Sequence, residues 1–108
     1  FVDVSRRYPE GMLIYGHLGG GGDWEYACKV LREAPSVYAE LSGSVHDARL
    51  VDLAVETLGV DRLLFSTDVN YEAAVGKVMF ADLTENERKK IFFDNFNNLL
   101  KKAGNNVD

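Results

Sequence analysis

Two apolar runs in this chain each end at a residue whose side chain can bind a metal ion. His17 follows the run at 13–16, and Asp68 follows the run at 63–65 by way of a Ser-Thr pair. In a parallel α/β sheet, the loops at the carboxyl ends of the strands diverge and form a cleft, so catalytic groups gather there. We therefore expect this imidazole and this carboxylate to share one site.

An imidazole and a carboxylate on neighbouring strands suit a divalent transition metal such as Zn²⁺. The bound ion lowers the pKa of its water toward about 7 and polarises a substrate carbonyl. In this hypothesis Asp68 binds the metal and takes the proton from its water. His17 binds the metal or donates a hydrogen bond to the developing oxyanion. Because a catalytic zinc usually has three protein ligands, this pair alone does not complete a site.

Structural roles remain open for the same residues. His17 can be a hydrogen-bonding loop residue, and Asp68 can cap the helix that begins near Tyr71. Glu40 is either a site residue or a salt-bridged interior carboxylate. The run Gly19–Gly22 resembles a phosphate cradle, but it lacks the Lys and Ser/Thr of a P-loop, and a tight turn explains it more simply.

Apolar strand-like segments alternate with amphipathic helical ones along the chain. Asp23 is the expected N-cap of one helix, and Gly59 has the position of a glycine just after a helix. Thr84 and Glu87 have the spacing of a capping box. We predict strands at 12–17, 36–41 and 62–67, and helices at 23–34, 47–58, 71–80, 84–93 and 96–103. Such βα repetition implies a parallel sheet with right-handed crossovers.

The alternation of side chains along a strand predicts which residues share a face with the site. If His17 faces the site, Leu13 and Tyr15 face it too, and Ile14 faces the helices. On the other two strands, the matching sets are Tyr38, Glu40 and Ser42, and Leu64, Ser66 and Asp68.

Composition limits the classes of partner. The chain has 108 residues, 46% of them hydrophobic, which suits one globular domain. Its net charge of −5 argues against nucleic acid and anionic membrane surfaces, and no apolar run approaches the roughly 20 residues that span a bilayer. A single cysteine, Cys28, excludes an internal disulfide and suits a reducing cytoplasm. On its apolar helix stripe, Cys28 is expected to be a small core residue, and His46 is expected to have a structural or solvent-facing role.

The first residues are typical of the end of a helix. Residues 1–8 have the pattern of the last turns of an amphipathic helix, and Pro9 ends it. We therefore expect the chain to be the carboxyl-terminal piece of something larger.

Five segments, in order and spacing, resemble the amidohydrolase-related metal-dependent hydrolases that have a TIM barrel, the amidohydrolase 2 group. The resemblance covers nearly the whole chain and implies an α/β fold, a partial (β/α)8 TIM barrel. Its three parallel strands would be the sixth to eighth of the barrel, with the missing strands from elsewhere. Residues 1–104 would be the carboxyl-terminal portion of that barrel and 105–108 a polar tail. The segments are Arg7–Pro9, Gly16–Gly20, Pro35–Gly43, Leu58–Asp68 and the helical region from Leu83 to Leu100.

The resemblance also implies roles for the two site residues. His17 matches the family's strand-six His, a metal ligand or catalytic acid/base. Asp68 matches the Asp that closes strand eight, a metal ligand, a general base, or both. The family's His-x-His pair on the first strand and its ligand from strand four or five have no counterpart here, and Ser66-Thr67 replaces the commoner Gly-Ser before the Asp. A complete metal site would therefore need barrel strands from another chain, including a second copy in a homo-oligomer, or from outside this sequence.

Two classes of function remain. The first is a cytoplasmic metal-dependent hydrolase or decarboxylase that acts on a small-molecule carboxylate, amide, ester or lactone. Its divalent metal ion is expected to be zinc. The second is a non-catalytic α/β module that self-associates through exposed strand edges. A small phosphate or nucleotide binder that uses the glycine turn is a weaker third alternative.

Overall fold

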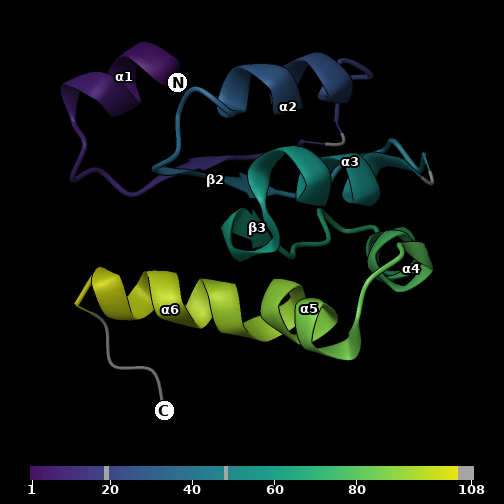
Figure 1. Ribbon diagram of the computed structural model, residues 1–108. Helices are drawn as coiled ribbons and strands as arrows, with labels where there is room; N and C mark the ends of the chain where they lie inside the picture. Colours follow the sequence, from purple (N-terminus) through teal and green to yellow (C-terminus); the bar gives the residue numbers. More distant parts are fainter. Residues whose placement is uncertain (19, 48, 105–108) are drawn as a thin grey trace.

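The computed structural model describes residues 1–18, 20–47 and 49–104. The predicted polar tail at 105–108 lies outside these residues, as do Gly19 of the glycine run and Ala48 of the predicted helix 47–58. Within the described ranges, short parallel strands alternate with helices (Figure 1). The elements are α1 (Val2–Arg7), β1 (Leu13–Tyr15), α2 (Trp24–Leu31), β2 (Val37–Glu40), α3 (Arg49–Leu58), the 3-10 turn η1 (Val60–Arg62), β3 (Leu63–Leu64), α4 (Tyr71–Phe80), α5 (Glu85–Lys89), the π-helical turn η2 (Lys90–Asp94) and α6 (Asn95–Lys102).

The three strands form one parallel sheet in the order β1-β2-β3. Leu13 pairs with Val37 across the first pair of strands, and Glu40 pairs with Leu64 across the second. All three carboxyl ends therefore lie at the same edge of the sheet, as the βα repetition predicted. Since β2 lies between β1 and β3, His17 and Asp68 follow strands that are not adjacent. This corrects the neighbouring strands assumed for the metal site and agrees with the strand order that the resemblance implies.

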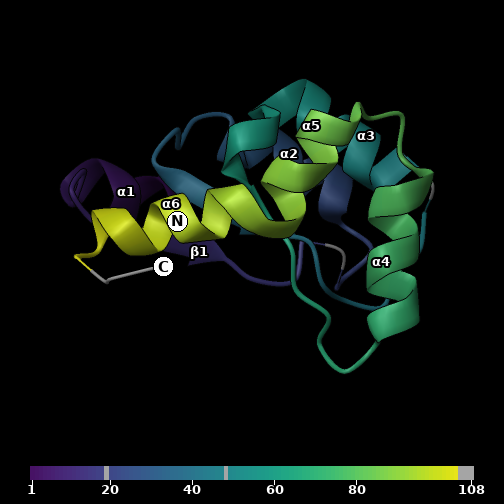
Figure 2. The same cartoon turned by 90° about the horizontal axis from the view of Figure 1, so that it is seen from below.

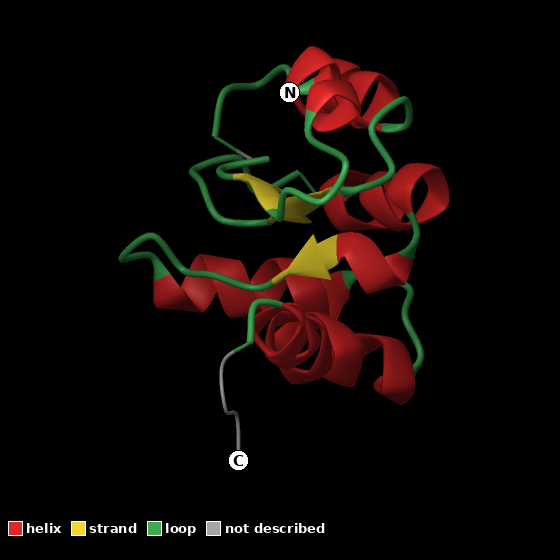
Figure 3. Ribbon diagram, turned by 90° about the vertical axis from the view of Figure 1, so that its left-hand side faces the viewer, coloured by secondary structure: helices red, strands yellow, loops and turns green. Residues whose placement is uncertain are grey.

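In the view of Figure 1, helices lie above and below the strands. Figure 1 shows α1 and α2 above the sheet and the α5–η2–α6 stretch below it, and Figure 3 shows the strands between these two groups. In Figure 2, α4 lies at the opposite end of the molecule from α1. This places α4, which follows β3, beyond the carboxyl ends of the strands.

One face of the sheet packs against the helices, and the opposite face is open at β1, although Leu64 of β3 is buried there. Val37, Ala39 and Leu63 are fully buried on the packed face, in a core that includes Leu31, Leu50, Val51 and Ile91 from the helices. Leu13 and Tyr15 pack against the same core, whereas Ile14 is 39% exposed. The predicted facing of β1 is therefore wrong, because its alternation places Leu13 and Tyr15 toward the helices and Ile14 on the open face.

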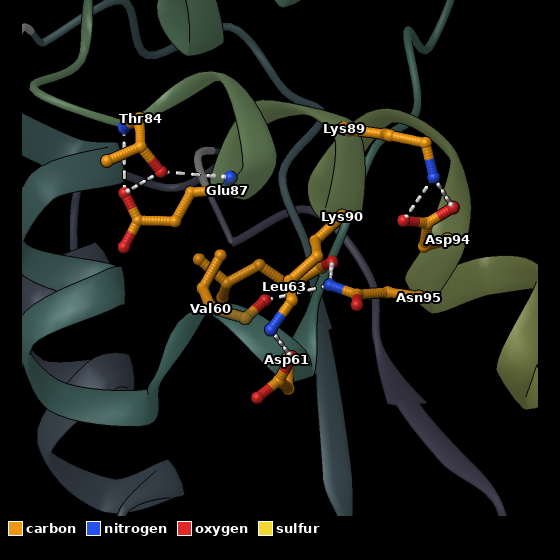
Figure 4. A network of polar contacts seen from close by, with 9 residues as sticks. All are labelled: Val60, Asp61, Leu63, Thr84, Glu87, Lys89, Lys90, Asp94 and Asn95. Atoms are coloured by element: carbon orange, nitrogen blue, oxygen red, sulfur yellow. Dashed lines mark hydrogen bonds and ion pairs between the residues drawn. The ribbon is translucent and has the colours of Figure 1, made fainter.

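The helical residues 85–102 run without a break, although we predicted separate helices at 84–93 and 96–103. Asn95, at the expected gap, has helical backbone angles (φ −63°, ψ −44°). The π-helical turn η2 joins α5 to α6 and accommodates one extra residue in its turn, so the helix continues. Asn95 is buried, and its Nδ2 donates to the carbonyls of Val60 and Leu63, each at 2.8 Å (Figure 4).

Most of the predicted helix ends are confirmed. Thr84 and Glu87 form the capping box at the start of α5 (Figure 4), and Gly59 has φ +82° just after α3. Asp23 is the N-cap residue of α2, as predicted, although its side chain makes no cap hydrogen bond. No described helix combines the length and the apolar character that crossing a membrane requires.

Candidate active site

His17 and Asp68 meet at the carboxyl edge of the sheet. The Nε2 atom of His17 lies 3.0 Å from Oδ2 of Asp68. Their side chains are 55% and 54% exposed, so both remain accessible from solvent. The pair reaches across the end of β2, which separates the two strands that carry them.

Three residues at this edge have left-handed backbone angles that non-glycine residues rarely adopt. They are His17 (φ +59°), Asp68 (φ +44°) and Val69 (φ +62°). The conformation is least favourable for Val69, because its β-branched side chain crowds the backbone. Such strain tends to cluster at functional sites, where the surrounding structure holds it in place.

The left-handed turn explains why the facing of β1 was mispredicted. Strand geometry ends at Tyr15, and the positive φ of His17 redirects the chain two residues later. Simple alternation from Leu13 and Tyr15 therefore does not apply to His17, whose side chain nevertheless reaches Asp68.

Glu40 lies between the two site residues, at the end of β2. Its Oε2 accepts a hydrogen bond from the backbone N–H of His17 at 3.0 Å and from Oγ of Ser42 at 2.8 Å. Its Oε1 accepts from the backbone N–H of Ser42, and its backbone carbonyl accepts from Leu18 N–H at 2.9 Å. Glu40 thus joins the ends of β1 and β2 directly.

Lys77 of α4 is a residue that the sequence analysis missed. It is only 8% exposed, and its Nζ donates to the carbonyls of Leu41 at 2.8 Å and Gly43 at 3.4 Å. Burial lowers the pKa of Lys77, and the negative charge of Glu40 opposes that shift. One signal was available: Lys77 is three residues after the small apolar Ala74 and is therefore on the same helix face.

The glycine run makes a tight turn against His17. The N–H of Gly20 donates to the carbonyl of His17 at 2.8 Å, and a Cβ added at Gly20 would lie 2.9 Å from the Cβ of His17. Gly22 has φ +75°. These features fit the tight-turn interpretation of this segment, of which Gly19 is outside the described residues.

The remaining candidates lie apart from this edge or are inaccessible. Cys28 is fully buried in the core, and burial raises the pKa of its thiol. His46 is exposed, as predicted. A hollow of about 560 Å³ lies at the amino ends of the strands, lined in part by Tyr38 and Arg62. It is at the opposite end of the sheet from His17, and Arg62 is bonded there to backbone carbonyls.

The donor chemistry of the pair fits part of a metal site. One imidazole nitrogen and one carboxylate oxygen are ligands that zinc and manganese both accept. Across residues 1–18, 20–47 and 49–104, no three His, Cys, Asp or Glu side chains are grouped so that they could hold a metal ion. His17 and Asp68 would therefore supply two ligands, with further ligands from elsewhere.

Comparisons with known proteins place this geometry in context. A family model described as amidohydrolase matches residues 1–99. A curated relative, the uncharacterized protein y4mH of Sinorhizobium fredii, is 27% identical in an alignment of 120 residues. The match covers 88% of this chain and 40% of the relative.

A solved structure shares the fold. A dihydroxybenzoic acid decarboxylase from Polaromonas sp. JS666, with bound manganese and the inhibitor 2-nitroresorcinol, matches with a TM-score of 0.69 at 24% identity. The match covers 93% of this chain and 36% of that one. The predicted fold class is thereby confirmed: the three strands and their helices form part of a TIM barrel. The chain spans well under half the length of either protein.

Proposed function

The chain belongs to the amidohydrolase family, and we propose that it supplies part of the active site of a metal-dependent hydrolase or decarboxylase. The observation that carries this proposal is the 3.0 Å approach of His17 Nε2 to Asp68 Oδ2 across an intervening strand. A structural ion pair would not need two residues in left-handed conformations at a solvent-exposed edge.

In this proposal His17 and Asp68 are both metal ligands and catalytic residues. A bound divalent ion would polarise the substrate and lower the pKa of a bound water. The related decarboxylase carries manganese, whereas the sequence led us to expect zinc, and the nitrogen and oxygen donors suit both ions. The two ions are distinguished by the metal content of the purified protein.

The two side chains divide the proton chemistry between them. The carboxylate of Asp68 accepts a proton from water or substrate, to which its half-exposed position gives access. If the metal is not bound through Nε2, the imidazole of His17 can instead turn its Nε2–H from Asp68 to the charge that develops on the substrate oxygen.

We infer a small-molecule carboxylate, amide, ester or lactone as substrate. The inhibitor of the related decarboxylase is a small aromatic molecule, which makes hydroxylated aromatic acids the first compounds to test. The other barrel strands would complete the pocket, either from a longer protein that contains this segment or from a second chain.

The test is made on a complete barrel that contains this segment. We expect Asp68→Asn to lower kcat by at least about 100-fold, since it removes a metal ligand and a proton acceptor, with little change in thermal unfolding temperature. Release of CO₂ from dihydroxybenzoates and hydrolysis of esters and lactones are measured in parallel. The matched control is Asp3→Asn on the exposed surface of α1. Turnover that survives Asp68→Asn at the control's level would contradict the proposal.

One observation favours the alternative of a self-associating module. Ile14 is 39% exposed on the open face, and β1 and β3 are both edge strands of the described sheet. A dimer of the full chain that forms without metal and dissociates with Ile14→Lys would support this function. A chain that stays monomeric at all concentrations would exclude it.

A further inference from the structure

We propose that Glu40 is a positioning residue that sets the approach of His17 to Asp68, and that Lys77 holds Glu40's own segment in place. The inference rests on the proposed function of the pair. Glu40 need not touch substrate or metal for this role. It acts through the backbone of His17, to which its Oε2 is bonded at 3.0 Å.

The first step of the argument is the backbone of His17. Its φ of +59° is unfavourable for a residue with a Cβ, so surrounding contacts must hold it there. Glu40 makes two such contacts, through its side chain to the N–H of His17 and through its carbonyl to the N–H of Leu18 at 2.9 Å. A hydrogen bond to a charged acceptor is stronger than one to a neutral acceptor, so the carboxylate is well suited to hold this turn.

The second step is the orientation of Glu40 itself. Both of its carboxylate oxygens are engaged by Ser42, Oε1 by the backbone N–H and Oε2 by the hydroxyl. Ser42 is buried, so these contacts are partly shielded from water. The carboxylate is therefore held in one orientation, with Oε2 directed at His17.

The third step connects this segment to the helix that follows Asp68. Lys77 donates to the carbonyls of Leu41 and Gly43, which flank Ser42 on either side. Because α4 begins three residues after Asp68, the hydrogen bonds of Lys77 connect the end of β2 to the βα unit that carries the Asp68 carboxylate. The contacts thus form a closed ring from Asp68 through His17, Glu40 and the 41–43 segment to Lys77.

The experiment uses NMR of the isotope-labelled full chain and compares Glu40→Gln with the wild type. Gln is nearly isosteric but offers one acceptor oxygen in place of two, so it cannot serve the N–H groups of His17 and Ser42 together. We expect an upfield shift of the His17 amide proton and loss of nuclear Overhauser contacts between its ring and Asp68. In a complete barrel that contains this segment, the Mn²⁺ dissociation constant of Glu40→Gln, from water proton relaxation, should be about 10-fold higher than that of the wild type, as for other residues that support metal ligands.

Two further variants make the result specific. Lys77→Met removes the donor to Leu41 and Gly43 and should shift the His17 amide in the same direction by less. Glu33→Gln is the matched control, since Glu33 is an exposed carboxylate whose partner is Arg6 of α1. It should leave the signals of His17 unchanged. If Glu40→Gln does not fold, Ser42→Ala is used instead, because it removes one donor to Oε2 of Glu40. The His17 amide shift and the contacts between the His17 ring and Asp68 are measured in the same way.

The outcomes separate positioning from the proposed function. A His17 amide and ring contacts that stay unchanged in Glu40→Gln would overturn the positioning role, even if the unfolding temperature falls. If a complete barrel that contains this segment fails to bind Mn²⁺, the metal-site proposal fails. The His17 signals then still decide whether Glu40 sets the geometry of the pair.

Discussion

The two ends of the sheet are built in opposite ways. At the amino end, the guanidinium of Arg62 donates to the backbone carbonyls of Leu31, Ala34 and Val37 at distances of 2.8 to 3.0 Å. At the carboxyl end, His17 and Asp68 are half exposed and bonded to each other.

Backbone conformation follows the same division. The left-handed non-glycine residues of the described chain lie at or just beyond the carboxyl ends of β1 and β3. At the amino end of β3, Asn95 instead satisfies the carbonyls of Val60 and Leu63. In TIM barrels the amino-terminal face supports stability and the carboxyl-terminal face carries the chemistry. Substitutions at the two ends should therefore have opposite consequences.

The largest loss of stability is expected from Arg62→Met. It keeps much of the apolar stem but leaves three carbonyls without their charged donor, which should lower the free energy of unfolding by about 3 kcal/mol. Urea unfolding measures the change. Arg49→Met is the control, because the ion pair of Arg49 with Glu56 is exposed and should contribute under about 1 kcal/mol. Equal losses in the two variants would show that the carbonyl contacts of Arg62 are unimportant.

Asn95→Ala should have the next largest effect. Asn95 is 4% exposed, so removing its amide leaves two carbonyls unpaired in the interior and should lower the free energy of unfolding by about 2 kcal/mol. Asn98→Ala, at an exposed position of the same helix, controls for the change in helix propensity. A neutral Asn95→Ala would mean that η2 and β3 do not depend on this side chain.

Val69→Gly, at the carboxyl end, should stabilise the protein. Val69 is fully exposed (relative exposure 101%) with φ +62°, so no burial is lost. Relief of about 1–2 kcal/mol of left-handed strain outweighs the greater freedom of glycine in the unfolded chain. We expect a net gain of about 0.5 kcal/mol by thermal unfolding. Val4→Gly, inside α1, should instead destabilise, and a loss in both variants would argue against strain at Val69.

Asp68→Asn should have the smallest effect on stability. Its side chain is 54% exposed, and an exposed ion pair contributes about 0–1 kcal/mol, so the free energy of unfolding should change by less than about 0.5 kcal/mol. Urea unfolding at neutral pH measures this. A loss as large as that of Asn95→Ala would make Asp68 a structural residue and would remove the contrast between the two ends.

Topology was the part of the site that the sequence could predict. Parallel strands place their carboxyl ends at one edge, so His17 and Asp68 could be assigned to one edge without knowing any side-chain contact. The capping box at Thr84 and the left-handed Gly59 were also predictable, because each depends on residue types at fixed spacing.

Features that depend on tertiary context could not be predicted. No residue type signals the left-handed backbone of His17, which is held by Glu40 from another strand, and so the facing of β1 was wrong. The continuous helix through Asn95 depends on carbonyls of residues 60 and 63, far away in sequence. Lys77 was missed because its partners are backbone carbonyls, which every sequence offers equally.

Mn²⁺ titration of the labelled full chain, followed by paramagnetic broadening of its amide signals, tests most directly whether the carboxyl edge holds metal. The account predicts that the signals of His17 and Asp68 broaden together at the lowest Mn²⁺ concentrations, before that of Asp61 near the opposite end of β3, and that Asp68→Asn abolishes this early broadening. Early broadening at Asp61 alone, or an unchanged pattern in Asp68→Asn, would contradict it.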